Sequence, residues 1–217
     1  MIASKKDLEK KKKLGQEILK ELRKLHPDAK IALKYRNNMQ LLAAVIMSAQ
    51  CTDKKVNEVT GTLFKKYKTV DDFAKANIKT FEKEIYQTGF YHAKAKNIIA
   101  SAKMIRKEFD GVLPKTMEEI LRLPGVARKT ANVVLGNAYG VVEGIAVDTH
   151  VKRLSKLYGL TAEIDPVKIE KDLMQIIPKK DWFKFTYMLI DYGRAECPAR
   201  PHAHEACPLT KLTSRKL

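Results

Sequence analysis

Lys129 is the residue whose type and position point most directly to chemistry. It stands in the segment LRLPGVARKTANVVLGNAYG (121–140), in the first turn of an expected helix that follows a Pro-Gly turn. The positive end of the helix dipole and the adjacent Arg128 both disfavour a second positive charge at this position. A neutral amine is a nucleophile and can form a Schiff base. An ordinary exposed lysine remains the alternative, because the sequence alone does not separate the two.

The turn before this lysine is the element that must position it. Pro124 halts the preceding helix, and Gly125 permits a tight turn and a close backbone approach. The next helix then points its first N–H groups outward, and such a helix start is an anion site. With phosphate as the anion, the turn would bind the DNA backbone independently of base sequence. Pro-Gly pairs are common in ordinary turns, so this signal is weak by itself.

The helix after the turn has one face of small and apolar residues. Four of them recur at helical spacing: Ala127, Ala131, Val134 and Ala138. We expect this face to pack against the core. Lys129 falls on the opposite side, which it shares with Asn132 and Gly136. The lysine is therefore expected to emerge over small residues.

Composition favours a nucleic-acid partner. The 217 residues include 42 Lys and Arg against 25 Asp and Glu, which gives a formal net charge of +17 and a pI of about 9.7. Such a surplus favours a polyanion, with nucleic acid first and an anionic membrane surface second. No apolar run approaches the ~18 residues that span a bilayer, and the N-terminus lacks the apolar region of a secretory signal. Three cysteines argue against a disulfide framework and for a reducing cytosol.

The elements around this segment are expected to be helical. Strand signals are scarce, and apolar residues recur at helical spacing in about ten segments, which predicts an all-α fold. The stretch MQLLAAVIMSAQ (39–50) is apolar nearly all round and predicts a central buried helix. Local signals mark several helix ends. Stops are expected at His26-Pro27 and at Gly159. Starts are expected at Asp148, at Asp165 and at the Thr116/Glu119 capping box.

Several motifs in order resemble one family. LPGVARKTANVVL resembles the hairpin of the endonuclease III family, within the helix-hairpin-helix DNA glycosylase superfamily. IAVDTHV is similar to its catalytic-aspartate loop, and LLAAVIMSAQCTD to its first core helix and the following loop. TGFYHAKAKNI and DYGRAEC also match. The resemblance runs from about Leu14 to Cys207, nearly the whole chain.

The resemblance implies a fold of two helical lobes with a DNA-binding cleft between them. One lobe is a six-helix barrel over about residues 31–142, with the helix-hairpin-helix motif at about 122–128. Residues 1–30 and 143–217 form the second lobe. The implied partner is double-stranded DNA with damaged bases or abasic sites, bound by a monomer in the cytoplasm, at the nucleoid. No membrane association is expected.

The resemblance also implies a bifunctional DNA glycosylase and abasic-site lyase that acts on oxidised pyrimidines in base excision repair. Lys129 matches the nucleophilic lysine and Asp148 the catalytic aspartate. Breaking an N-glycosidic bond builds positive charge on the sugar, and a carboxylate stabilises it. Asp148 could also help to deprotonate Lys129. A plain N-cap for the helix from Thr149 is the alternative for Asp148, and the two roles are compatible.

Excision requires the nucleotide to be flipped out of the duplex, and the gap must be filled. Gln50 matches the family's wedge glutamine, and Phe90 or Tyr91 lies in the second intercalating loop. Phe90 in the core is the alternative. Asp53 is expected to support the pocket, and His150 to orient Asp148, contact phosphate or simply pack. The hairpin match adds these expected DNA contacts: Leu123, Gly125, Ala127, Arg128 and Thr130. Other basic residues that could line the DNA path are Lys94, Lys96, Lys152 and Arg153.

The chain departs from the family at two places. Many relatives hold an iron–sulfur cluster through cysteines spaced C-x6-C-x2-C-x5-C, whereas here the four positions are Cys197, His204, Cys207 and Thr213. Such a cluster needs four ligands, so we predict that it is absent and that no cofactor is needed. Zinc bound by Cys197, Cys207 and either His202 or His204 is the alternative, with an uncertain fourth ligand and unusual spacing. A packed or DNA-facing loop is the favoured interpretation.

The second departure is Ala127, where the hairpin often has glycine, so a left-handed backbone there would be in doubt. Two other functions remain open. One is a mismatch-specific glycosylase of the same fold, in which Lys129 adds only slow lyase action. The other is a non-catalytic DNA-binding module, which would have no need of both Lys129 and Asp148.

Overall fold

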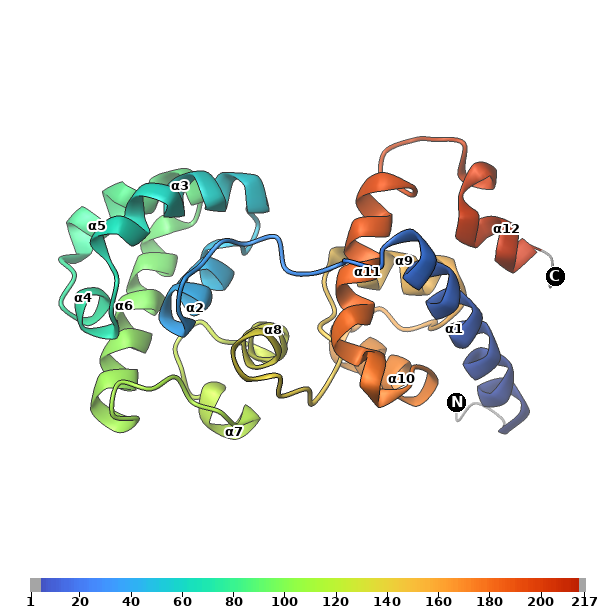
Figure 1. Ribbon diagram of the computed structural model, residues 1–217, viewed down its shortest axis with the longest axis horizontal. Helices are drawn as coiled ribbons and strands as arrows, with labels where there is room; N and C mark the ends of the chain where they lie inside the picture. Colours follow the sequence, from blue (N-terminus) through green and yellow to red (C-terminus); the bar gives the residue numbers. More distant parts are fainter. Residues whose placement is uncertain (1–4, 215–217) are drawn as a thin grey trace. The chain divides into compact units, whose positions relative to one another are not determined.

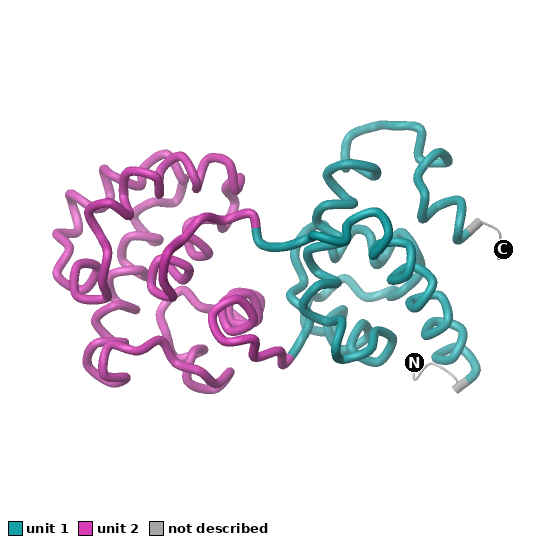
Figure 2. Tube along the Cα trace, in the orientation of Figure 1, with its two compact units in different colours: residues 1–31, 144–217 teal, residues 32–143 magenta. Residues whose placement is uncertain are grey.

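The computed structural model describes residues 5–214, and helices are its only regular elements (Figure 1). The chain divides into two compact units, of which one is continuous, from Ala32 to Glu143. The other combines the N-terminal segment up to Ile31 with the chain from Gly144 onward (Figure 2). Within residues 5–214 no helix is both long and apolar enough to cross a membrane. The all-α prediction is confirmed.

The continuous unit is built around helix α2. Its elements are α2 (Asn38–Met47), α3 (Asp53–Lys66), α4 (Val70–Ala74), α5 (Ile78–Ile85), η1 (Tyr86–Thr88), α6 (Tyr91–Glu108), α7 (Met117–Ile120) and α8 (Arg128–Tyr139). Every residue of α2 from Met39 to Met47 is buried, and α3, α6 and α8 pack against it. The prediction of a central helix from the apolar run is therefore confirmed, because a helix that is apolar all round must be covered on every side.

The start of α2 shows how polar residues support this core. The side chain of Asn37 caps the helix by accepting a hydrogen bond from the Gln40 N–H at 3.0 Å. Gln40 is itself buried, and its amide donates to the Tyr67 carbonyl at 3.0 Å. These bonds satisfy polar groups that would otherwise destabilise the core.

The second unit packs the N-terminal helix against the C-terminal ones. Its elements are α1 (Lys5–Leu25), α9 (Thr149–Leu157), α10 (Pro166–Ile176), η2 (Lys179–Asp181), α11 (Trp182–Ala195), η3 (His204–Ala206) and α12 (Pro208–Ser214). Helix α1 contacts α10, α11 and α12, while α9 packs on α11 (Figure 1). Gly15 lets α1 approach α10 closely, because a Cβ there would lie 2.4 Å from Ile176 Cγ2.

The helix ends follow most of the local signals. Helix α1 ends at Leu25, before His26-Pro27, and Asp165 caps α10 with Pro166 in its first turn. The capping box at Thr116 forms only in part. Thr116 Oγ1 accepts from the Glu119 N–H, but its hydroxyl donates to the Glu119 carboxylate. In a full capping box, the Glu119 carboxylate would instead accept a hydrogen bond from the backbone N–H of the N-cap residue, Thr116.

Candidate functional site

The Pro-Gly turn between α7 and α8 is held against α6. Gly125 has φ +79°, a left-handed conformation that favours glycine. A Cβ at Gly125 would also lie 2.7 Å from Asn97 Nδ2, so the position has no room for a side chain. Ser101 of α6 donates to the Pro124 carbonyl at 2.8 Å, and Leu123 is buried. The turn is therefore a fixed part of the continuous unit.

Ala127 is the N-cap residue of α8 and has extended backbone, with φ −90° and ψ 169°. Any L-residue adopts this conformation, so alanine in place of glycine causes no strain. Alanine offers no oxygen, and α8 has no side-chain cap hydrogen bond at its start. The first N–H groups of α8 are thus not bound by a capping side chain, as an anion site at a helix start requires.

Lys129 lies in the first turn of α8 and is exposed, between half-buried Arg128 and Thr130. The rest of the helix differs from the prediction of one packed face. All residues from Ala131 to Gly136 are buried, so the helix is covered on more than one side. Lys129 therefore does not lie opposite a single packed stripe; it lies in the first turn, before the buried part of the helix begins.

Asp148 belongs to the second unit and caps helix α9. Its Oδ1 accepts a hydrogen bond from the Val151 N–H at 2.8 Å, and the residue is half-buried. Asp148 therefore does act as an N-cap, as the alternative from the sequence proposed. Capping uses only one oxygen, and a carboxylate has two with several lone pairs, so it does not exclude a second role.

His150 lies against helix α11. A Cβ built on Gly193 would come within 2.5 Å of His150 Nδ1, and the residue is half-buried. This close contact favours the packing alternative for His150, with Nδ1 directed into the second unit. Gly193 is needed there because any larger residue would displace the imidazole ring.

Gln50 and Phe90 share an unusual backbone. They have φ values of +51° and +48°, and of the non-glycine residues described only Asp110 joins them in the left-handed region. Such a conformation costs about 1–3 kcal/mol at a residue with a side chain, and it concentrates at functional sites. Both side chains are exposed, Phe90 at 66%. The alternative that Phe90 belongs to the core is wrong. This shared strain has no sequence signal.

Lys94 joins the two loops that carry Gln50 and Phe90. Its Nζ donates to the Met47 carbonyl at 2.8 Å and to the Thr88 carbonyl at 2.7 Å, and the residue is only 4% exposed. Burial lowers the pKa of Lys94. The prediction that Lys94 lines the DNA path is wrong, because the ammonium group is bound inside the protein.

The two other residues expected near these loops begin helices. Asp53 is the first residue of α3, after the N-cap Thr52, and is half-buried. A carboxylate in this position is stabilised by the helix dipole. Tyr91 is the first residue of α6 and is also half-buried, with its ring 4.0 Å from that of His92. Neither placement by itself assigns a role in a pocket.

A cluster of four possible metal ligands lies between α11 and α12. One ligand atom each of Cys197, His202, His204 and Cys207 lies within 4.8 Å of the other three. The zinc alternative from the sequence used either His202 or His204, and the structure brings both to the cysteines. Thiolates and imidazoles are ligands that bind transition metals, so this group could hold a metal ion.

Comparison with known proteins assigns this arrangement to a family. Residues 43–179 match the family described as HhH-GPD superfamily base excision DNA repair protein. The endonuclease III of Synechocystis sp. is 50% identical over 202 residues, which cover 93% of this chain and 92% of that protein. The endonuclease III of Bacillus subtilis is 44% identical and covers 87% of this chain, with 86% of its own length matched. The chain belongs to the endonuclease III family of helix-hairpin-helix base excision repair proteins.

Solved structures agree with this assignment. A trapped endonuclease III–DNA covalent intermediate has 43% identity and a TM-score of 0.85, over 90% of this chain and 93% of that one. A non-covalent endonuclease III–DNA complex has 41% identity and a TM-score of 0.88, over 94% of this chain and 99% of that one. A thermostable thymine-DNA glycosylase shares the fold, with a TM-score of 0.80 at 21% identity, 92% coverage of this chain and 95% of its own.

Proposed function

We propose that this protein is a bifunctional DNA glycosylase and abasic-site lyase that removes oxidised pyrimidines, with Lys129 as nucleophile. The observation that carries the proposal is an exposed lysine at the uncapped start of the helix that follows the hairpin, in a chain of the endonuclease III family. A relative at 43% identity has been trapped as a covalent intermediate with DNA, which supports a covalent route. The proposed setting is the nucleoid in the cytoplasm, with the protein acting as a monomer.

The proposed reaction begins at C1′ of the damaged nucleotide. The Lys129 amine forms a bond to C1′, and the N-glycosidic bond breaks as the base leaves with its electron pair and takes up a proton. Asp148 stabilises the positive charge that builds on the sugar. Ring opening gives an iminium ion that acidifies the C2′ hydrogen. Loss of that proton expels the 3′ phosphate by β-elimination, and water then releases Lys129 by hydrolysis.

DNA binding is proposed to use the hairpin and the two strained loops. The first N–H groups of α8 would donate hydrogen bonds to a phosphate oxygen, with Arg128 beside them. Gln50 and Phe90 would enter the gap left by the flipped nucleotide, where an amide can pair with the orphaned base and a ring can stack on its neighbours. Their exposure and left-handed backbone support this proposal.

No step of this reaction needs a metal, and we propose that the chain lacks the four-thiolate cluster of its relatives. Of the three cysteines, Cys197 and Cys207 meet, while Cys51 belongs to the other compact unit. The fourth family position is Thr213, whose hydroxyl donates to the Thr210 carbonyl inside α12. Two thiolates and two imidazoles do not match a four-thiolate donor set.

Borohydride trapping on DNA with an abasic site tests the covalent step. We expect the wild-type protein to form an adduct that survives denaturation, and Lys129→Gln to lose it while DNA affinity changes little. Lys103→Gln, an exposed lysine of α6, is the matched control and should trap like the wild type. The covalent mechanism is refuted if the wild type gives no adduct or if Lys129→Gln still traps.

Asp148→Asn separates catalysis from capping. Asparagine caps a helix about as well as aspartate, so unfolding free energy should stay within about 0.5 kcal/mol of the wild type. Loss of the charge should slow base release by about 10²–10³-fold, the usual effect of removing one electrostatic stabiliser. If single-turnover excision by Asp148→Asn equals that of the wild type, Asp148 is only a cap.

The substrate is tested by comparing single-turnover excision on two duplexes. One carries an oxidised pyrimidine, and the other a G·T mismatch. Faster release of the oxidised base supports the proposal. Faster release of the mismatched thymine favours the mismatch-specific alternative. Binding to both without any excision favours a non-catalytic module.

A further inference from the structure

We propose that the loop between α11 and α12 binds one zinc ion through Cys197, His202, His204 and Cys207. The proposal does not depend on the repair activity. Cys197 follows α11, and Cys207 precedes α12, so the four ligands lie within eleven consecutive residues, 197–207. One ligand atom from each lies within 4.8 Å of the others.

The spacing of these atoms suits a single tetrahedral ion. Zinc binds sulfur at about 2.3 Å and nitrogen at about 2.0–2.1 Å, so neighbouring ligand atoms on one ion should lie about 3.3–3.8 Å apart. Cys197 Sγ and His204 Nδ1 are 3.6 Å apart, and Cys207 Sγ and His202 Nε2 are 3.2 Å apart. Each sulfur thus has an imidazole nitrogen at about the distance that a shared ion requires.

Both imidazole rings are held as metal-bound histidines usually are. A carbonyl can only accept, so His202 Nδ1 must donate to the Arg200 carbonyl at 2.9 Å, which leaves the Nε2 lone pair facing Cys207. His204 Nε2 lies 3.0 Å from Thr210 Oγ1, which is positioned to accept its N–H. The Nδ1 lone pair of His204 then faces Cys197. Such outer hydrogen bonds fix the tautomer and orient the ring toward a metal.

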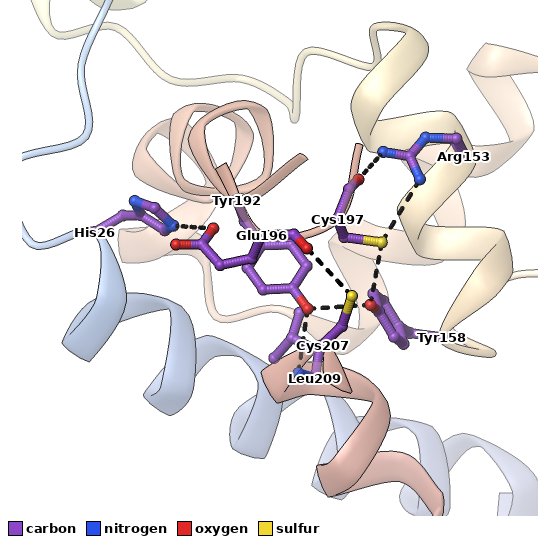
Figure 3. Close-up of polar contacts among 8 residues, drawn as sticks. All are labelled: His26, Arg153, Tyr158, Tyr192, Glu196, Cys197, Cys207 and Leu209. Atoms are coloured by element: carbon purple, nitrogen blue, oxygen red, sulfur yellow. Dashed lines mark hydrogen bonds and ion pairs between the residues drawn. The ribbon is translucent and has the colours of Figure 1, made fainter. Parts of the chain in front are cut away.

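The surroundings of Cys197 suit a thiolate ligand. Arg153 Nη1 lies 3.7 Å from Cys197 Sγ, and the Tyr158 hydroxyl donates to the same sulfur at 3.6 Å (Figure 3). Arg153 also donates to the Cys197 carbonyl at 2.5 Å. These donors stabilise negative charge on sulfur and fix the backbone that carries it.

Cys207 is the second buried cysteine of the cluster. Its thiol donates to the Glu196 carbonyl, with Sγ and oxygen 3.2 Å apart (Figure 3). Metal binding would replace this proton and that of Cys197, so two protons leave for each ion bound. Both cysteines are buried, whereas His202 is exposed and leaves a route for the ion from solvent.

The geometry distinguishes zinc from an iron–sulfur cluster. A cluster with two cysteines and two histidines places the cysteines on one iron and the histidines on the other, so sulfur and nitrogen ligands are farther apart than on one ion. Here each sulfur has an imidazole nitrogen close by, at 3.6 Å from Cys197 Sγ and 3.2 Å from Cys207 Sγ, as ligands of one ion do. Four protein ligands leave no open position, which is typical of a structural zinc site. The ion would tie the end of α11 to α12, which packs on α1.

Metal analysis and cobalt substitution test the proposal on the full-length protein. After purification with a reducing agent and addition of zinc sulfate, we expect one tightly bound zinc per chain. Cobalt(II) added to metal-free protein should give intense d–d bands and thiolate-to-cobalt charge transfer, typical of tetrahedral coordination with sulfur. Cys51→Ser removes the third cysteine and should change neither result.

Two variants test the ligands and their support. His204→Ala should abolish the tetrahedral cobalt spectrum. Thr210→Val keeps all four ligands and should weaken zinc affinity by about 10–100-fold, as loss of an outer hydrogen bond does. If His204→Ala is not folded by circular dichroism, Thr210→Val decides. The proposal is overturned if the wild type binds no zinc, holds iron with acid-labile sulfide, or keeps wild-type zinc affinity in Thr210→Val.

Discussion

Lys94→Met removes a buried ammonium group that connects two loops of the continuous unit. Lys94 Nζ donates to carbonyls at the end of α2 and at the end of η1, at 2.8 and 2.7 Å. Helix ends leave such carbonyls without a partner inside the helix, so Lys94 supplies what the backbone lacks. Methionine has a similar length and fits the space, but it donates no hydrogen bond.

The expected loss follows from these two bonds. A hydrogen bond to a charged group contributes about 1.5–3 kcal/mol, and a buried carbonyl left unpaired costs about 1–3 kcal/mol. Lys94 is 4% exposed, and burial lowers its pKa, so the wild type already has a desolvation cost that methionine removes. Allowing for this offset, Lys94→Met should lower the unfolding free energy by about 2–4 kcal/mol.

Urea unfolding measures this loss, with Lys96→Met as the matched control. Lys96 lies on the same helix, two residues further on, and is exposed, so its substitution should stay within about 0.5 kcal/mol of the wild type. Gln50 and Phe90 follow the two bonded carbonyls by three and two residues. Without the two bonds, these loops should be less ordered in the free protein, so DNA binding must order them. An ordering cost of about 1.4 kcal/mol would weaken binding to abasic DNA tenfold.

The reasoning is refuted if Lys94→Met is no less stable than Lys96→Met. A loss of stability with unchanged affinity for abasic DNA would refute the link to the loops while leaving the packing argument intact. Both measurements use the same two variants, so Lys96→Met shows how removal of one exposed positive charge from α6 affects DNA binding.

Three further substitutions test other parts of the structure. Phe90→Ala should leave stability unchanged and weaken binding to abasic DNA by about 1–3 kcal/mol, the contribution of one stacked ring, as titration of labelled DNA would show. Gly125→Ala should cost about 1–3 kcal/mol in urea unfolding, because φ is +79° and the new Cβ would meet Asn97. Tyr67→Phe removes the bond from the hydroxyl to Glu84 at 2.8 Å and should cost about 1 kcal/mol at neutral pH. Burial, and then the Glu84 bond, raise the pKa of Tyr67, so its contribution is full below about pH 10 and is lost as the pH rises through the folded pKa. The difference in unfolding free energy between the wild type and Tyr67→Phe should therefore narrow in alkaline urea melts. A difference that stays constant with pH would contradict this.

Much of the local structure could be predicted from the residues themselves. The apolar run of α2 predicts burial, Gly125 predicts a left-handed turn, and Asp148 predicts a helix start. Each signal depends on sterics and hydrogen bonds within a few residues of chain, so it is complete in the sequence. The order of motifs also indicated the family, because a family signature is likewise a property of sequence.

What only the tertiary structure decided is which side chains meet and which reach solvent. The sequence by itself gave Lys94 as a basic residue that could line the DNA path, Phe90 as a loop or core residue and His202 as one of two candidate zinc ligands. It did not determine that Lys94 is buried, Phe90 exposed and His202 beside Cys207. Burial of Lys94 depends on carbonyls 47 and 6 residues away, which helix packing brings to its ammonium group. The metal-ligand cluster depends likewise on how the loop after α11 folds back on itself. The residue types and spacing gave the zinc ligands only as an alternative, because whether two side chains meet depends on packing that short-range patterns do not determine.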